Sequence, residues 1–123
     1  MKLGLFAAVA SLALALPGVS FQAVEWSPPS GFWAGKTLSG VALSVDEPRA
    51  FLAVRTAVEL LVTARNMMPS AISIQSKYAL DRDWGTDSLR EGLESGKTAN
   101  EIIREWNPRV AEFKKLREKY LLY

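Results

Sequence analysis

Hydrophobic positions change their spacing near the middle of the chain, from a strand-like to a helix-like pattern. Residues 19–26 alternate with β-branched and aromatic side chains, and residues 40–45 form a second candidate strand. Residues 27–39 contain two prolines and two glycines, which predicts a loop. From residue 50 to 68 the polar side chains recur at helical spacing, so a mostly buried helix is predicted, ended by Pro69.

The segment after this helix is harder to assign. Residues 70–80 are ambiguous, although Ile72 and Ile74 alternate as in an edge strand. Two aspartates, an arginine, a tryptophan and a glycine then follow, and residues 81–85 are predicted to form a turn.

Start and stop signals predict three short helices in the C-terminal third. In the first, Thr86 or Ser88 can be the N-cap, Ser88 and Glu91 have the spacing of a capping box, and Gly96 supplies a left-handed stop. Thr98 and Glu101 repeat the capping box for the second helix, which Asn107-Pro108 ends.

The third helix carries one apolar stripe, made of Val110, Phe113, Leu116 and Tyr120. This stripe is predicted to be buried, as is Trp106 on the second helix. Residues 16–123 are therefore predicted to be a single α+β domain, with a small β-sheet packed by one long helix and three shorter C-terminal helices.

Residues 1–15 decide the expected location of the protein. Lys2 precedes an uncharged apolar run, and Ala13-Leu14-Ala15 has the form of a signal-peptidase site, so a secretory signal peptide is predicted. The protein would then be secreted or periplasmic. The alternative is a buried N-terminal apolar helix in a protein that stays cytoplasmic. The run is shorter than the roughly 20 residues that a stable membrane span needs.

Composition excludes several classes of function. The chain of 123 residues has 15 basic and 13 acidic side chains, which are well mixed along it, and a net charge of +2. A nucleic-acid surface would instead show a clustered basic patch. With neither cysteine nor histidine, the chain has no thiolate or imidazole for nucleophilic catalysis or metal binding.

Two motifs come close to known ligand sites without matching them. Residues 31–37 and 92–98 both end in Gly-Lys-Thr, but three residues separate their glycines where a phosphate-binding loop has four. Asp81, Asp83 and Asp87 lack the spacing of a calcium loop, and nothing fixes two of them as a glycosidase pair. No cofactor, metal ligand or catalytic residue is predicted.

Two blocks of residues carry a likeness to a known family. The C-terminal block consists of Gly85-Thr86, Leu89-Arg90, Gly96-Lys97, Glu101-Ile102-Ile103, Trp106, Phe113, Arg117 and Tyr120-Leu121-Leu122-Tyr123. The N-terminal block consists of Leu16-Pro17-Gly18-Val19, Phe21, Gly40-Val41 and Phe51. In this order and spacing, residues 16–123 resemble the C-terminal domain of the bacterial peptidoglycan exo-β-N-acetylmuramidases, the NamZ family.

The resemblance implies a role without chemistry of its own. In that family of glycoside hydrolases the catalytic machinery is expected mainly in a larger N-terminal domain, which these residues do not include. The chain is then an auxiliary domain that completes the substrate cleft or docks on a catalytic domain. Its expected partners are a muramidase catalytic domain and peptidoglycan glycan. Two alternatives are an interaction module from a truncated or split gene and an independent small glycosidase.

Three residues are the candidates for binding substrate or docking a second domain. Trp33 in the loop and Trp84 in the predicted turn are flat side chains that suit stacking on sugar rings. Arg90 is the arginine of the resemblance's Gly-Thr-x-x-Leu-Arg segment, which implies that it lines the side facing the catalytic domain. The three are predicted to converge on one partly apolar surface.

Overall fold

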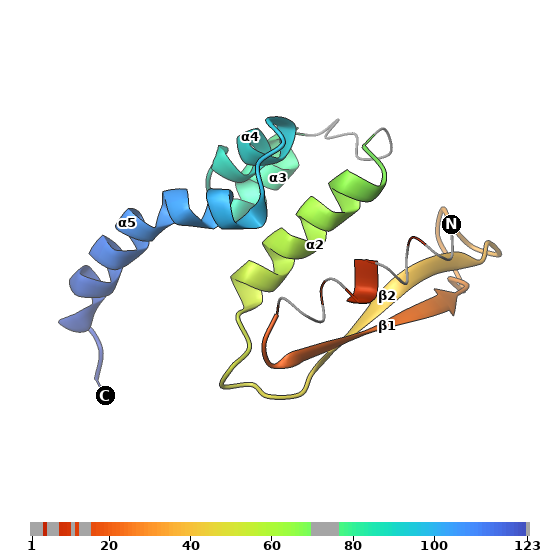
Figure 1. The fold of residues 1–123 in the computed structure, drawn as a ribbon, viewed down its shortest axis with the longest axis horizontal. Coiled ribbons are helices and arrows are strands. Elements are labelled where there is room, and N and C mark those ends of the chain that lie inside the picture. The colour runs from red at the N-terminus through yellow and green to blue at the C-terminus, as the bar shows by residue number, and fades with distance from the viewer. Residues whose placement is uncertain (1–3, 5–7, 11, 13–15, 70–76, 123) are drawn as a thin grey trace. The chain divides into compact units, whose positions relative to one another are not determined.

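A computed structural model describes residues 4, 8–10, 12, 16–69 and 77–122. The chain divides into two compact units, residues 1–63 (unit 1) and 64–123 (unit 2). The α+β class is confirmed (Figure 1). The elements are β1 (Val19–Trp26), β2 (Leu38–Val45), α2 (Ala53–Met67), α3 (Lys77–Trp84), α4 (Ser88–Glu94) and α5 (Ala99–Glu118).

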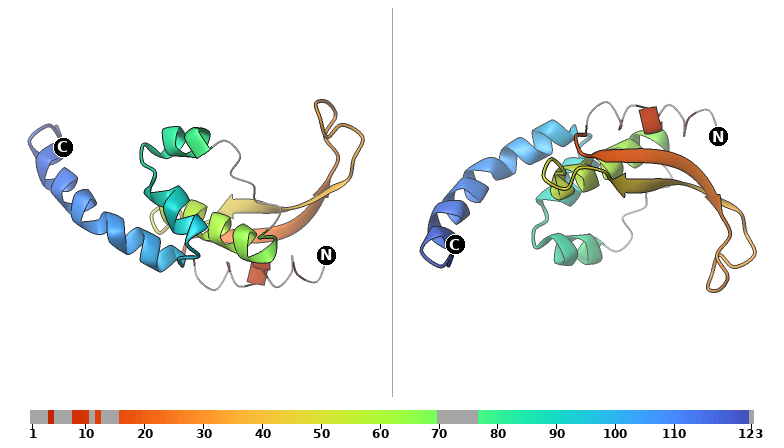
Figure 2. Two further views of the ribbon diagram at one scale, coloured as in Figure 1. Left: turned by 90° about the horizontal axis from the view of Figure 1, so that it is seen from above. Right: turned by 90° about the horizontal axis from the view of Figure 1, so that it is seen from below.

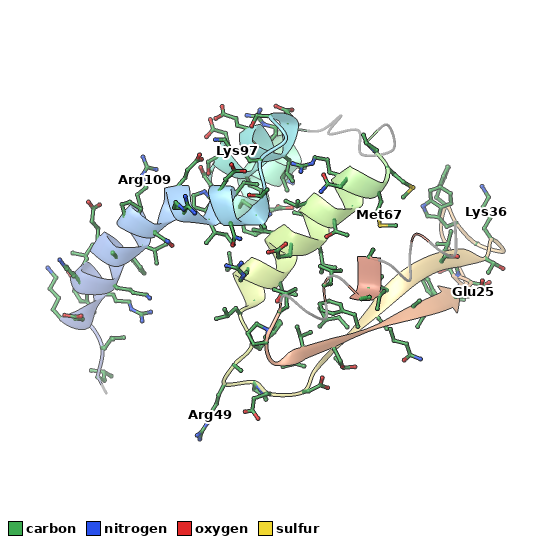
Figure 3. The ribbon with its side chains drawn as sticks, viewed as in Figure 1. Glu25, Lys36, Arg49, Met67, Lys97 and Arg109 are labelled. Carbon is green, nitrogen blue, oxygen red and sulfur yellow. The ribbon has the colours of Figure 1, made fainter. Side chains whose placement is uncertain are left out.

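Unit 1 is built on a β-hairpin. β1 has the predicted bounds, and β2 begins at Leu38, two residues before the predicted start. The strands are antiparallel, in a register that pairs Val19 with Val45 and Trp26 with Leu38. The Pro/Gly-rich residues between the strands form the tip of the hairpin, and Figure 3 shows Lys36 at this end and Arg49 at the opposite end.

Gly18 joins the two ends of the hairpin. Its carbonyl oxygen accepts hydrogen bonds from the backbone N–H groups of Asp46 and Glu47, at 3.0 and 3.2 Å. Gly18 has φ +73°, and a Cβ there would lie 2.5 Å from the Glu47 carbonyl oxygen. Glycine is therefore required for both its backbone conformation and its lack of a side chain.

The core of unit 1 includes part of the N-terminal apolar run. Leu12, Leu16 and Val19 are buried together. The partly buried side chains of Phe21, Phe51 and Leu60 pack against them. Residues 8–10 and 12 are helical, and Ala8, Leu12 and Leu16, four residues apart, are all buried. Ala8 and Leu12, which are both helical, thus lie four residues apart, the spacing of one helix face.

The long helix α2 lies within the predicted range. It carries an Arg55–Glu59 ion pair one turn apart, at 3.5 Å. Buried Thr56 donates its hydroxyl to the Leu52 carbonyl oxygen at 2.9 Å, so its polar group is satisfied. The ambiguous residues 70–76, with Ile72 and Ile74, lie outside the described part of the chain.

The predicted turn at residues 81–85 is wrong for all but its last residue. Residues 81–84 form the second half of α3, and only Gly85, with φ +71°, has a conformation that ends a helix. The local cluster of aspartates suggested a turn, but Ala79, Leu80 and Arg82 are good helix formers.

The capping box predicted at Ser88 and Glu91 is also wrong. Asp87 is the N-cap of α4, and its side chain makes no capping hydrogen bond. Ser88 is the first residue of the helix, where its backbone N–H donates to the Thr86 hydroxyl at 3.2 Å. The predicted stop at Gly96 is confirmed by φ +77° there.

The second capping box is confirmed, whereas the predicted break at Pro108 is wrong. Thr98 and Glu101 cap α5 reciprocally, and the helix then continues through Pro108 to Glu118. The two last predicted helices are thus one helix of 20 residues, which is longer than α2. Proline removes one N–H donor and bends a helix, and Figure 2 shows α5 curving along its length.

The core of unit 2 lies between α4 and the first turns of α5. Its buried apolar residues are Leu89, Leu93, Ala99 and Ile102. Gly92 lets the two helices approach, because a Cβ there would lie 2.7 Å from Ile102 Cγ1. Among the helices of the described segments, none is long and apolar enough to cross a membrane.

Candidate functional site

The tip of the hairpin is an exposed aromatic cluster. Phe32 and Trp33 are 85% and 50% exposed, and their rings meet edge to face with centroids 4.9 Å apart. Trp26, at the end of β1, is exposed as well. Large aromatic side chains are usually covered in folded proteins, so three exposed ones on one hairpin mark this end as a candidate binding surface.

Lys36 places a positive charge over the two tip rings. Its Nζ atom lies 5.0 Å from the centroid of Trp33 and 5.8 Å from that of Phe32. Cation–π contacts at exposed sites contribute about 0.5 to 1 kcal/mol, enough to favour this position of the ammonium group. Lys36 is also the only charged residue between Trp26 and Val45. We call Phe32, Trp33 and Lys36 the tip cluster.

The backbone beneath the tip cluster is held by short-range hydrogen bonds. The Ala34 N–H donates to the Gly31 carbonyl oxygen, and the Lys36 N–H donates to that of Trp33, both at 3.1 Å. Gly31 and Gly35 have φ +88° and +75°, a region that glycine adopts without strain. Phe32, Trp33 and Lys36 therefore project from a defined turn.

A second cluster lies in unit 2, where Trp84 of α3 meets Trp106 of α5. Their ring centroids are 5.7 Å apart, and the Trp106 indole Nε1 donates to the Ser88 hydroxyl at 2.7 Å. Both tryptophans are partly buried. The pair packs α3 and α5 around the first residue of α4, so it has a clear structural role.

Arg90 ties α3 to α4. Its Nε donates to both carboxylate oxygens of Asp81 at 3.0 and 3.1 Å, and its Nη1 donates to Glu94 Oε2 at 3.2 Å. The hydrogen bond to Asp81 is the largest of the effects that raise the pKa of Arg90. The Arg90 side chain is only 15% exposed, and its guanidinium group already faces two carboxylates. It therefore stabilises the fold of unit 2.

Arg65, near the end of α2, is a residue that the sequence analysis missed. Its Nη1 donates to the carbonyl oxygens of Leu93 and Lys97 at 3.2 and 2.9 Å. A cation there satisfies free carbonyl groups and complements the negative end of the α4 dipole. One signal was present, because Arg65 lies outside the helically spaced polar positions Arg55, Glu59, Thr63 and Asn66.

Residues 92–98, one of the two near-matches to a phosphate-binding loop, have a complete structural explanation. Gly92 makes room for Ile102, Gly96 ends α4, and Thr98 caps α5. The nearby aspartates are accounted for in part by ion pairs, Asp81 with Arg90 and Asp83 with Arg82. Within the described residues, no three acidic side chains are grouped so that they could hold a metal ion.

The second half of α5 carries an exposed apolar stripe. It was predicted to be buried, but Phe113 is 60% exposed, and its neighbours along the stripe are exposed too. We call this surface the α5 stripe; it comprises Val110, Phe113 and Leu116 of the helix, together with Tyr120, Leu121 and Leu122, which follow the end of the helix. The prediction failed because helical periodicity shows that a face is apolar, and not where its partner lies.

The three predicted site residues fall in different units. Trp33 belongs to unit 1, whereas Trp84 and Arg90 belong to unit 2. Trp84 and Arg90 both help to fasten α3, through Trp106 and Asp81 respectively. The convergence of all three on one surface stays a prediction.

Comparisons with known proteins give a consistent result. The profile of the family described as "Exo-beta-N-acetylmuramidase NamZ, C-terminal" matches residues 5–123. The chain is 31% identical over 110 residues to the peptidoglycan β-N-acetylmuramidase NamZ of Bacillus subtilis strain 168, covering 89% of this chain and 27% of that protein. Its fold is similar to the crystal structure of a DUF1343 family protein from Bacteroides fragilis NCTC 9343, with a TM-score of 0.82 and 20% identity, over 97% of this chain and 33% of that one.

Proposed function

The chain belongs to the family of C-terminal domains of the exo-β-N-acetylmuramidase NamZ, and from this membership we propose a specific role for it. It acts as a non-catalytic auxiliary domain in peptidoglycan turnover. It docks on the catalytic part of a muramidase and helps to complete the substrate cleft.

The α5 stripe is the observation that carries this proposal. Exposed apolar patches of more than a few hundred Å² generally mark interaction sites, and aromatic side chains contribute most to such interfaces. The chain spans 27% of its Bacillus subtilis relative and 33% of the Bacteroides fragilis protein. In both proteins most of the chain thus lies outside the shared region, and in the proposed role that remainder would cover the stripe.

The chain's own side chains support an auxiliary role. It contains no histidine or cysteine, and the carboxylate of Asp81 is engaged by Arg90. A glycosidase needs an acid and a second carboxylate held about 5 to 9.5 Å apart across the scissile bond. We expect the purified chain alone to release no N-acetylmuramic acid from a chromogenic muramide. Turnover lost on Asp83→Asn or Asp87→Asn would contradict this expectation.

Contact with the glycan is the second part of the proposed role. Trp33 is the predicted site residue best placed for it, because half of its surface is exposed on a defined turn. Trp84 and Arg90 take part indirectly, by fixing α3 against its neighbours. In this role they are positioning residues.

The docking part is tested with the catalytic portion of the Bacillus subtilis relative, produced without its region similar to this chain. We expect a complex by size-exclusion chromatography and calorimetry. Phe113→Asp should abolish it, because a charge would be buried in an apolar interface. Phe32→Asp alters an equally aromatic, exposed position in unit 1 and serves as the matched control. Absence of a complex, or an unchanged affinity for Phe113→Asp, would favour an interaction module unrelated to the muramidase.

We also propose that the N-terminal apolar run is kept in the mature protein as part of unit 1. The burial of Leu12 and Leu16 in the core, and the family match that starts at residue 5, support this over removal as a signal peptide. Leu12→Asp should then unfold unit 1, whereas Ala10→Asp, at an exposed position, should be tolerated. Mass spectrometry of the protein isolated from its host would detect the intact run. If residues 1–15 are missing from that protein, the result would support a cleaved signal peptide and a secreted or periplasmic location instead.

A further inference from the structure

We infer that the tip cluster is a glycan-binding site that prefers sugars bearing a carboxylate. The ligand class is an N-acetylhexosamine chain in which some rings carry an acidic substituent. The indole of Trp33 and the ring of Phe32 would stack on the apolar faces of the sugar rings, and the Lys36 ammonium group would pair with the carboxylate. This inference rests on the proposed function for the identity of the glycan, because the relative named in the comparison acts on peptidoglycan.

The tip cluster is both exposed and held in a defined conformation. Phe32 is the most exposed aromatic side chain in the described residues, and Trp33 is exposed beside it. The turn beneath them is fixed by two backbone hydrogen bonds and two left-handed glycines. Little conformational freedom is therefore lost when a ligand binds, which favours even a small contact.

Lys36 argues against a purely apolar occupant. Its ammonium group lies within 6 Å of both ring centroids, so any surface pressed onto the rings also covers the charge. Burying an ammonium group without an anionic partner is costly. The tip cluster is also small beside the roughly 800 Å² per partner that a stable protein interface buries. A sugar with a carboxylate instead meets the rings and the charge together.

Polar groups at the base of the tip agree with a hydroxylated ligand. The Ser27 and Thr37 hydroxyls face each other across the hairpin at 3.4 Å, a long contact that either group can exchange for a ligand hydroxyl. Between Trp26 and Val45 the sequence has no aspartate or glutamate. This stretch therefore contributes no negative charge that would repel an anionic sugar chain, and the nearest acidic residue along the chain is Glu25, next to Trp26 on β1.

The test compares two glycans of equal length with the intact chain. One is a peptidoglycan strand freed of its peptides, whose lactyl groups carry carboxylates, and the other is a neutral chito-oligosaccharide. We expect both to shift the indole signal of Trp33 in NMR spectra and the carboxylated strand to bind more tightly. Lys36→Met should remove this preference by lowering the affinity for the carboxylated strand about fivefold. Added salt should lower that affinity in wild type in the same way, because it screens the charges. Lys36→Arg should largely retain it.

Trp33→Ala should abolish binding of both glycans and leave docking to the catalytic portion intact. Phe113→Asp should do the reverse, so failure of the glycan site and failure of the docking proposal can be told apart. The inference is overturned if neither glycan shifts the Trp33 signal at several millimolar, or if Lys36→Met binds the two glycans as wild type does. Binding of the tip to phosphatidylglycerol vesicles in place of glycan would also overturn it.

Discussion

The two halves of α5 belong to one helix but have opposite surroundings. In the first half, Ala99 and Ile102 are buried, and Trp106 is held by Ser88 and Trp84. In the second half, beyond Pro108, the α5 stripe is exposed. Both halves have a similar amphipathic pattern in the sequence. The comparison shows that such a pattern reveals a face that needs a partner, while the partner itself can belong to another part of a longer protein.

The largest expected effect is on the free energy of unfolding, which substitutions in the two halves of α5 should change by very different amounts. Ile102→Ala should lower the free energy of unfolding by about 3 to 4 kcal/mol, because it empties a fully buried site. Phe113→Ala should change it by less than about 0.5 kcal/mol, as is usual for exposed positions. Urea unfolding followed by circular dichroism measures both. Equal losses for the two variants would show that the second half of α5 is covered within the chain itself.

The close contact of α4 with the first half of α5 gives the next effect. Gly92→Ala should destabilise the protein by about 1 to 2 kcal/mol, because the new methyl group meets Ile102. This loss would occur even though alanine is about 1 kcal/mol better than glycine within a helix.

Two further variants sharpen the test of this contact. Gly40→Ala, where a Cβ would meet nothing within 4 Å, is the control for adding a methyl group. In an Ile102→Ala background the Gly92 substitution should cost much less, because the clashing atoms are gone. Strictly additive losses would mean that the two helices separate to accommodate the methyl group.

The hydrogen bond from Trp106 to Ser88 gives a smaller effect. Trp106→Phe keeps an aromatic ring but loses the indole N–H, and Ser88→Ala removes the acceptor. Each should cost about 1 kcal/mol, the usual net value of such a bond. Thermal unfolding of the double variant should show less than the sum of the single losses. Full additivity would indicate that the bond contributes nothing to the packing of α5.

The smallest effect concerns the cap at the start of α5. The backbone N–H and the hydroxyl of Thr98 both donate to the Glu101 carboxylate. The two hydrogen bonds lower the pKa of that carboxyl, and the backbone one has the larger effect. A lowered pKa in the folded state adds stability above the ordinary glutamate value, and this stability disappears as the pH falls through the folded value. Wild type should therefore exceed Glu101→Gln in stability near neutral pH and lose that advantage in acid. A constant difference between pH 7 and about pH 3 would contradict this linkage.

The sequence predicted the elements well where residues that are close in the chain determine the backbone conformation. The hairpin strands, the stop at Gly96 and the capping box of Thr98 follow from short-range chemistry. The capping box at Ser88 failed because its hydroxyl has a partner 18 residues away, and the break at Pro108 failed because a proline can bend a helix without ending it.

The candidate site was less predictable than the fold. Trp33 was identified from its place in a Pro/Gly loop, but the contact of Lys36 with its ring depends on how that loop folds. Arg90 was identified by resemblance, whereas its two carboxylate partners lie on different helices, and Arg65 acts across 28 and 32 residues. Such long-range contacts cannot be read from local spacing.

Pro108 has a consequence for the way α5 opens. It has no amide hydrogen, so the ladder of exchangeable protons along the helix is interrupted between its buried and exposed halves. In the free chain, amides before Pro108 should exchange only when the core of unit 2 opens, whereas those beyond it should exchange through local fraying. Binding of a catalytic partner would raise the protection of the second half alone. Deuterium uptake could then map the docking surface along a single helix, with the first half as an internal reference.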